Sequence, residues 1–197
     1  MNQAFVLGNG TSRLNIDPTI LKTVGTVYAC NASYRDFTPD HLIAVDAKMI
    51  DELLEHGVHK QLKIWTNPNK KFEDIKELNV FNPSLGWSSG PTALNLASTL
   101  GHTEIYILGF DYQGIKNRLF NNVYADTHNY RKSTEPATYY GNWLRQTEEV
   151  IKNNPTIKFY RVIETGQYKP DWSYNNFFHI DYDLFKTKIN YYSLVKN

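Results

Sequence analysis

Short apolar runs separated by polar turn segments recur along most of the chain. A continuous apolar run bounded by glycine or another turn-forming residue is typical of a strand buried on both faces, as in a parallel sheet. The pattern therefore predicts strands at residues 4–7, 25–30, 41–45, 62–65, 80–81, 104–109 and 157–163.

Apolar residues at helical spacing separate several of these runs. Residues 48–56 carry apolar side chains three and four positions apart, and Gly57 ends the segment. Residues 93–100 show the same period. They follow Ser-Ser-Gly-Pro at 88–91, which supplies an N-cap and a proline in the first turn, and Gly101 follows as a C-cap. Further helices are expected over 72–78, 138–153 and 184–189.

This alternation of strands and helices has the spacing of βα units and predicts one α/β domain over residues 1–197. We expect a Rossmann-like, doubly wound, mainly parallel sheet with helices on both faces. Two segments show no clear period. Residues 112–136 are polar and are expected to form an irregular, lid-like loop, and loops of about 25 residues in a compact domain are usually functional or disordered. Residues 167–197 form an aromatic C-terminal extension.

Composition narrows the classes of function. The 21 Lys+Arg are balanced by 20 Asp+Glu, so the chain lacks the basic surface that binding to duplex nucleic acid requires. The single cysteine, Cys30, excludes an internal disulfide framework and a multi-cysteine zinc site. No apolar stretch approaches the ~18 residues of a spanning helix, and the N-terminus lacks the features of a signal peptide. These features predict a cytoplasmic protein without a resident metal.

The turn after the first predicted strand is a candidate phosphate site. It reads Gly8-Asn9-Gly10-Thr11-Ser12. Glycines let the backbone approach a phosphate, whose oxygens then accept hydrogen bonds from amides and hydroxyls. The turn matches neither the dinucleotide pattern G-x-G-x-x-G nor the Walker pattern. The alternative is a tight βα turn that needs glycine because of a positive φ.

Polar residues follow three other predicted strands: Asn31, Asp46 and Asn67. The strand at 104–109 leads to Asp111, which is a further candidate binding residue. Because the carboxyl ends of parallel strands meet at one edge of a sheet, we expect such side chains to lie close together. Amides there suit a base or ribose, and Asp46 suits a hydroxyl or the role of a base. Ser89 and Gly90, at a predicted helix N-terminus, form a second candidate anion site. The alternative is that these residues only cap turns and helices.

The lid-like segment holds the candidate catalytic residues. His128 is a candidate general base, because the ordinary pKa of histidine lies near 6.5. Tyr124, Tyr130, Arg131 and Lys132 are candidates for neutralising a leaving phosphate without a metal ion. The alternative is a solvated surface loop with an incidental histidine.

Taken together, these motifs resemble a known family. Residues 5–12 are similar to the opening strand and GNG-x-S turn of the bacterial sialyltransferases of glycosyltransferase family 42, and residues 28–31 to their second strand. Ser89-Gly90-Pro91, the run at 101–111 and Tyr124-Ala125-x-Thr127 resemble later motifs of the same family, in the same order across about residues 4–150. The core also resembles motility accessory factors, the archaeal 6-hydroxymethylpterin diphosphokinase and proteins of marine phages.

The resemblance implies a CMP-sugar site at the strand ends, without a required metal. It implies that Asn9, Asn31 and Ser89 contact the nucleotide, that Asp46 stands where the family has a second asparagine, and that Tyr124 faces the phosphate. His128 aligns with the earlier histidine of the family's motif. Arg131 or Lys132 occupies the place of the catalytic histidine.

Three hypotheses follow. The first is a glycosyltransferase that takes a small nucleotide-activated sugar of the CMP type and an acceptor hydroxyl. The second is a diphosphokinase that needs Mg²⁺ and a nucleoside triphosphate, with Asp46, Asp111 or Asp126 as ligands. The third is a non-enzymatic nucleotide-binding or partner-binding module, a homo-oligomer in which the aromatic tail covers a neighbouring subunit. For a phage-encoded chain the expected location is the host cytoplasm.

Overall fold

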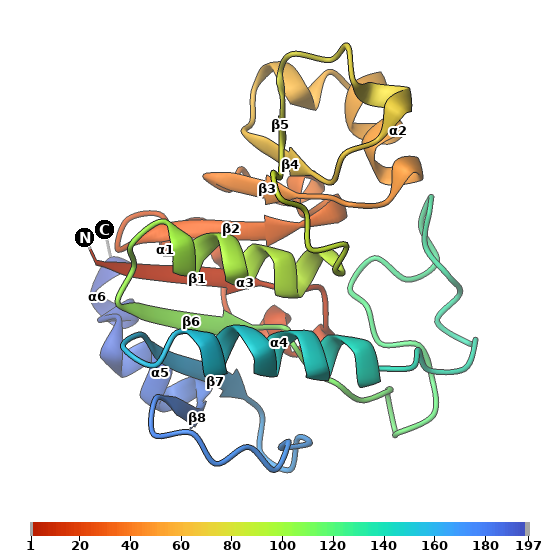
Figure 1. Cartoon of the computed structure of the whole chain (residues 1–197). Helices are drawn as coiled ribbons and strands as arrows, with labels where there is room; N and C mark the ends of the chain where they lie inside the picture. Colours follow the sequence, from red (N-terminus) through yellow and green to blue (C-terminus); the bar gives the residue numbers. More distant parts are fainter. Residues whose placement is uncertain (1, 196–197) are drawn as a thin grey trace.

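Eight parallel strands form a single sheet at the centre of the molecule. The computed structural model describes residues 2–195, and the strands lie side by side in the order β5-β4-β3-β2-β1-β6-β7-β8 (Figure 1). The strands are β1 (Gln3–Leu7), β2 (Thr26–Cys30), β3 (His41–Ile43), β4 (Ile64–Thr66), β5 (Leu78–Val80), β6 (Glu104–Leu108), β7 (Lys158–Ile163) and β8 (Phe177–Asp181). The predicted doubly wound α/β fold is confirmed.

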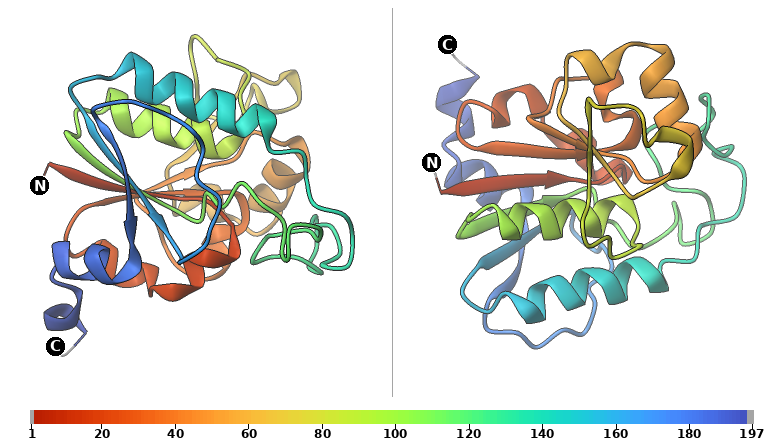
Figure 2. Two further views of the ribbon diagram at one scale, coloured as in Figure 1. Left: turned by 90° about the horizontal axis from the view of Figure 1, so that it is seen from below. Right: turned by 45° about the horizontal axis from the view of Figure 1, so that its top comes forward.

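Helices cover both faces of this sheet. They are α1 (Pro18–Leu21), α2 (Ala47–Glu55), α3 (Ser89–Thr99), α4 (Gly141–Asn153), α5 (Tyr182–Lys188) and α6 (Tyr191–Leu194). Four 3-10 turns, η1 (Thr11–Asn15), η2 (Asn31–Arg35), η3 (Val58–Lys60) and η4 (Lys70–Phe72), lie between them. Figure 2 shows α3 and α4 on one face of the sheet and α1 and α5 on the other. Buried residues of α2 pack in the same core cluster as those of α1 and α5.

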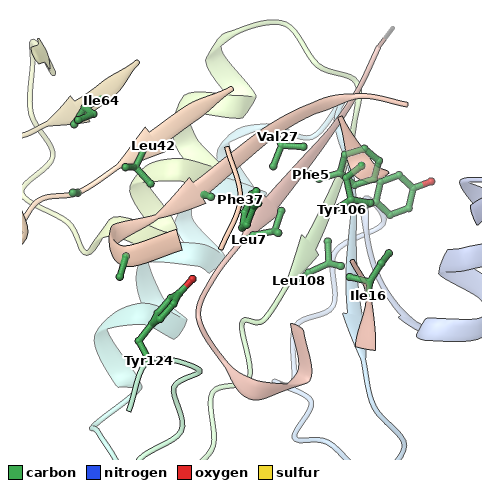
Figure 3. Packing of buried hydrophobic residues seen from close by; sticks show 14 of the residues in the cluster. Phe5, Leu7, Ile16, Val27, Phe37, Leu42, Ile64, Tyr106, Leu108 and Tyr124 are labelled. Atoms are coloured by element: carbon green, nitrogen blue, oxygen red, sulfur yellow. The ribbon is translucent and has the colours of Figure 1, made fainter. Parts of the chain in front are cut away.

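The apolar runs are explained by burial on both faces. In β1, Phe5 and Leu7 pack in the core beneath α1, α2 and α5, whereas Ala4 and Val6 pack beneath α3 and α4. Figure 3 shows Phe5, Leu7 and the neighbouring Tyr106 in the first of these cores. Full burial of a side chain such as Leu7 contributes about 1.5–3 kcal/mol, so a central strand without polar positions gains from both layers.

Two parts of the predicted secondary structure are wrong. Residues 72–78 form no helix. Ile75 N–H donates to the Phe72 carbonyl and Leu78 N–H to the Ile75 carbonyl. The apolar spacing that suggested a helix therefore comes from successive turns, each closed by a hydrogen bond between residues three apart. The strand expected at 80–81 begins earlier, at Leu78, because Leu78 pairs with Ile64 of β4.

The C-terminal extension is less irregular than expected. Phe177–Asp181 pair with β7 as the edge strand β8, and α5 begins directly afterwards. Phe177 and Ile180 are buried, whereas Phe178 remains 39% exposed, so the run lacks the continuous burial of a central strand. The aromatic tail therefore completes the sheet of its own chain, and its role in a homo-oligomer stays a prediction.

The lid-like segment 112–136 contains no helix or strand, as predicted, and extends beyond the carboxyl ends of the strands (Figure 1). The chain leads from β1 towards β2 on one side and from β6 towards β7 on the other. The switch point of the sheet therefore lies between β1 and β6, where open α/β sheets bind their ligands.

Arg161 of β7 fixes the chain at this switch point. Its side chain is 1% exposed, and it donates to the carbonyl oxygens of Phe110 at 2.8 Å, Asp111 at 3.1 Å and Tyr168 at 2.7 Å. One buried guanidinium thus holds both the turn after β6 and the loop after β7.

We expect Arg161→Met to lower the free energy of unfolding by about 3 kcal/mol or more, because three carbonyl groups lose their donor and each loss costs about 1–3 kcal/mol. Urea denaturation measures the change. Arg145→Met on the exposed side of α4 is the matched control and should stay within about 0.5 kcal/mol of the wild type. Equal effects of the two substitutions would show that Arg161 does not hold these turns in place.

Candidate functional site

A cavity of about 450 Å³ lies at the carboxyl ends of the central strands. The segments that follow β1, β2, β3, β4 and β6 all contribute to its wall, together with the start of α3 and the region before α4. Its place at the switch point and its size are those expected of a site for a small ligand.

The glycine turn after β1 packs against the turn after β6. Gly8 N–H donates to the Leu108 carbonyl at 2.8 Å and Gly10 N–H to the Gly109 carbonyl at 2.9 Å. A Cβ on Gly8 would lie 2.7 Å from the Gly109 oxygen, so no side chain fits there. These amides are therefore already bonded within the protein. Neither glycine has a positive φ, so close packing of the two turns, and not a left-handed backbone, is what requires glycine here.

The rest of the turn is bonded in the same way. The Thr11 amide and hydroxyl both donate to Asn121 Oδ1 at 2.9 Å, and the Ser12 amide donates to Asp111 Oδ2 at 3.2 Å. Gly8, Asn9 and Gly10 line the cavity, but Thr11 and Ser12 are not among its lining residues. Phosphate binding by this turn stays a prediction.

Asp111 is a buried junction at the edge of the cavity. Its carboxylate accepts hydrogen bonds from the Ser12 amide at 3.2 Å and hydroxyl at 2.5 Å, from Asn121 Nδ2 at 3.0 Å and from Gln167 Nε2 at 2.8 Å. With four donors engaged, the carboxylate holds three segments of the chain in place and has little capacity left for a ligand.

Three neighbouring strands present open hydrogen-bonding groups to the cavity. Asn31 Oδ1 accepts from Ser89 Oγ at 2.9 Å and Asn67 Oδ1 accepts from Ser84 Oγ at 2.7 Å, so each amide keeps an NH₂ group without a partner in the described chain. Asp46 stands at the N-cap position of α2 but makes no side-chain cap bond, and its carboxylate is exposed. Asn31, Asp46 and Asn67, which were expected to lie close together at the strand ends, all line this cavity, and so do Ser89 and Gly90 of the second candidate site.

The start of α3 adds a positive pole. Ser88 occupies the N-cap position without a side-chain cap bond, and the amides of Ser89 and Gly90 find no acceptor within residues 2–195. Free amides at a helix N-terminus carry partial positive charge and favour an anion. The rings of Trp87 and Trp143 line the cavity as flat apolar walls.

The predicted catalytic tyrosines lie outside the cavity lining. Tyr124 is buried, donates to Asp36 Oδ2 at 2.5 Å and accepts from Arg13 at 2.9 Å, and burial raises its pKa to about 12. Tyr130 packs on Tyr124 with ring centroids 5.5 Å apart, and its hydroxyl accepts from the Ala32 amide at 3.4 Å. Both tyrosines therefore tie the lid-like segment to η2 and the residue after it, through Ala32 and Asp36, and not to the cavity.

The remaining three catalytic candidates face solvent. The side chains of His128, Arg131 and Lys132 are exposed, and Arg131 pairs with Glu135 at 2.9 Å. None of the three lines the cavity. The cavity thus brings together most of the predicted nucleotide-binding residues, all but Thr11 and Ser12, whereas the predicted catalytic residues lie on the lid-like segment outside its lining. The roles of both groups stay predictions.

Two arginines that the sequence did not single out hold this segment, of which Arg13 is buried and Arg35 is partly exposed. Arg13 is 3% exposed and donates to Asn9, Ser33, Asp36 and Tyr124. Arg35 donates to Glu52 Oε1 at 2.9 and 2.5 Å and to Thr127 Oγ1 at 2.8 Å, and Asn129 donates to Glu52 Oε2 at 2.8 Å. An arginine in a polar stretch gives no local sign of burial, because its partners are up to 111 residues away.

Tyr140 and Trp143 were also missed, although both lie near the start of a predicted helix and line the cavity. Aromatic residues at a helix start pack in a core as readily as they bind a ligand, so the sequence alone did not distinguish them.

The fold is similar to that of a bacterial sialyltransferase. Two structures of the sialyltransferase CstII from Campylobacter jejuni, one with the substrate analogue CMP-3FNeuAc and one with cytidine-5′-monophosphate, match this chain with TM-scores of 0.52 and 0.51. The identities are 18% and 17%; the first match covers 82% of this chain and 81% of CstII, the second 82% and 79%. At this identity the likeness establishes the fold.

No protein-family model and no curated protein sequence matches the chain. No helix within residues 2–195 is long and apolar enough to cross a membrane. In the same residues, no group of three or more His, Cys, Asp or Glu side chains is arranged to hold a metal ion.

Acid should release the lid-like segment from α2. Burial alone would raise the pKa of Glu52, but hydrogen bonds from Tyr34, Arg35 and Asn129 lower it below its ordinary value. A lowered carboxylate pKa stabilises the folded form above the ordinary value of 4.5, and this contribution is lost as the pH falls through the lowered pKa. The protection factors of residues 124–130 against hydrogen exchange, which correct for the intrinsic pH dependence of exchange, should therefore fall below about pH 4.5 before the sheet unfolds.

Glu52→Gln should produce the same loss of protection at neutral pH. Asp51→Asn, on the same helix in an exposed pair with Lys71, is the control and should leave residues 124–130 protected. Protection that is equally strong in both variants would show that the Arg35–Glu52 pair does not hold the segment.

Proposed function

We propose that this chain binds a nucleotide-activated sugar of the CMP type in the cavity and transfers its glycosyl group to an acceptor hydroxyl. The observation that carries the proposal is the convergence of Asn31, Asp46 and Asn67 beside the free N-terminus of α3. The sialyltransferase that shares the fold was crystallised with CMP and with a CMP-sugar analogue, which supports the same ligand class here.

The residues suggest how such a ligand lies. The amide groups of Asn31 and Asn67 match the donors and acceptors of a pyrimidine or ribose, and Trp87 offers a flat surface for packing. The phosphate belongs at the start of α3, because none of the residues found to line the cavity is Lys, Arg or His. The helix terminus is then the main source of positive potential for the anion.

The proposed reaction needs one bond to form and one to break. The acceptor oxygen attacks the anomeric carbon, the bond from that carbon to the phosphate oxygen breaks, and the electron pair stays on the phosphate. The amides of Ser89 and Gly90 stabilise the charge of the leaving phosphate. The acceptor proton goes to a general base, for which His128 is the predicted residue.

Tyr124, Tyr130, Arg131 and Lys132 are the residues predicted to neutralise the departing phosphate. Since neither they nor His128 line the cavity, these roles require the segment held by Arg13 and Arg35 to move towards the start of α3. The proposed binding of the nucleotide does not depend on that movement.

Binding of CMP in the presence of a chelator tests the proposal. At 100 times its Kd, CMP should add about 2.7 kcal/mol to the free energy of unfolding and raise the Tm by roughly 5–10 °C. Asn31→Ala should reduce the shift, whereas Asn153→Ala, on the exposed end of α4, should not. Stabilisation only by a nucleoside triphosphate with Mg²⁺, or by no nucleotide, would contradict the proposal.

Asp46 should discriminate ribose from deoxyribose. An open carboxylate among amide groups suits the ribose hydroxyls, and a hydrogen bond to a charged group contributes about 1.5–3 kcal/mol, or roughly 10- to 150-fold in affinity. By calorimetry, the wild type should bind CMP more tightly than 2′-deoxy-CMP, and Asp46→Ala should lose that preference. Asp74→Ala, at an exposed position, is the control. A preference that survives Asp46→Ala would exclude this role.

A further inference from the structure

The end of the cavity that is formed by the chain between β6 and the first turn of α4 contains a shielded hydroxyl without a partner in the described chain. Tyr140 precedes α4 and lines the cavity, and its hydroxyl oxygen is shielded from solvent and has no hydrogen-bond partner in the described chain. Its ring contacts Trp143, with ring centroids 5.5 Å apart at 64°. A buried polar group without a partner destabilises the folded chain, so native proteins rarely keep one without a reason.

Tyr140 is available as a donor. Burial, with a smaller contribution from the charge of Asp111, raises its pKa to about 12, so the phenol keeps its proton at neutral pH. The four acceptor bonds of Asp111 are already taken by Ser12, Asn121 and Gln167.

Two side-chain amides that line the same cavity, those of Gln113 and Asn122, are also open, and both open groups are donors. Gln113 Oε1 accepts from the Tyr168 amide at 2.5 Å, and Asn122 Oδ1 accepts from the Tyr124 amide at 2.9 Å. Because a backbone N–H donates to each side-chain oxygen, the NH₂ groups are the ones left without partners among residues 2–195. Both residues line the cavity.

We propose that this end of the cavity is the subsite for the glycosyl group of the ligand, where Tyr140, Gln113 and Asn122 donate to its oxygen atoms and Trp143 packs against its ring. Sugars carry hydroxyl and ether oxygens around an apolar ring face, which matches neutral donors beside an aromatic wall. The subsite rests on the proposed function, because it needs the nucleotide at the opposite end, over Asn31 and Asp46.

The conservative substitution Tyr140→Phe tests the subsite against two probes, CMP and CMP-3FNeuAc. Loss of one neutral hydrogen bond should weaken binding of CMP-3FNeuAc about 3- to 10-fold and leave the affinity for CMP unchanged. Tyr139→Phe is the matched control, because the neighbouring Tyr139 is 80% exposed. An equal loss for both probes, or no loss for either, would overturn the assignment.

Asn122→Asp is a second variant. It keeps the oxygen that accepts from the Tyr124 amide but removes the NH₂ donor, so it should also weaken CMP-3FNeuAc more than CMP. An unchanged ratio of the two affinities would remove Asn122 from the subsite.

The Tm of the unliganded protein supplies an independent readout. Because Tyr140→Phe removes an unpartnered group, its Tm should equal or exceed that of the wild type, whereas removal of a structural hydrogen bond would lower it. Failure of the wild type to bind either probe would defeat the proposed function and the subsite with it. A lower Tm of Tyr140→Phe would overturn the open-donor assignment alone.

Discussion

The close crossing of the turns after β1 and β6 is the constraint on which the rest of the structure depends. Gly8 and Gly10 bond directly to the carbonyls at the end of β6, and a side chain at Gly8 has no room. Directly beyond the crossing, Asp111 collects donors from η1, from Asn121 and from Gln167. Looser packing at this point would shift the strand ends that line the cavity and the two segments that frame it.

The central part of the fold was predictable because strands that are buried on both faces appear in the sequence as continuous apolar runs. Strands such as β1 and β6 have no polar interior position, and α3 begins where its N-cap and proline place it. The edges of the sheet were harder. Phe178 of β8 is partly exposed, and the turns over 72–78 imitate helical spacing, so the local pattern was ambiguous in both places.

In the candidate site, too, residues next to buried strands were predictable and residues of irregular segments were not. Asn31 and Asp46 were identified because a residue directly after a buried parallel strand must lie at the carboxyl edge of the sheet. No comparable rule places the residues of the irregular segment. Its polarity indicated exposure, whereas Tyr124 is buried against Arg13, and Tyr140 reaches the cavity only because of how the loop before α4 folds. Long-range contacts between loops decided these positions.

Arg13 gives the molecule a thermodynamic link between two of its parts. The same guanidinium bonds to Asn9, in the wall of the cavity, and to Tyr124, in the lid-like segment. Binding free energies are coupled reciprocally. A ligand that favours the bonded orientation of Asn9 would therefore strengthen the hold of Arg13 on Tyr124 by the same factor by which that hold strengthens the ligand, and the movement that the proposed catalytic roles require would weaken both.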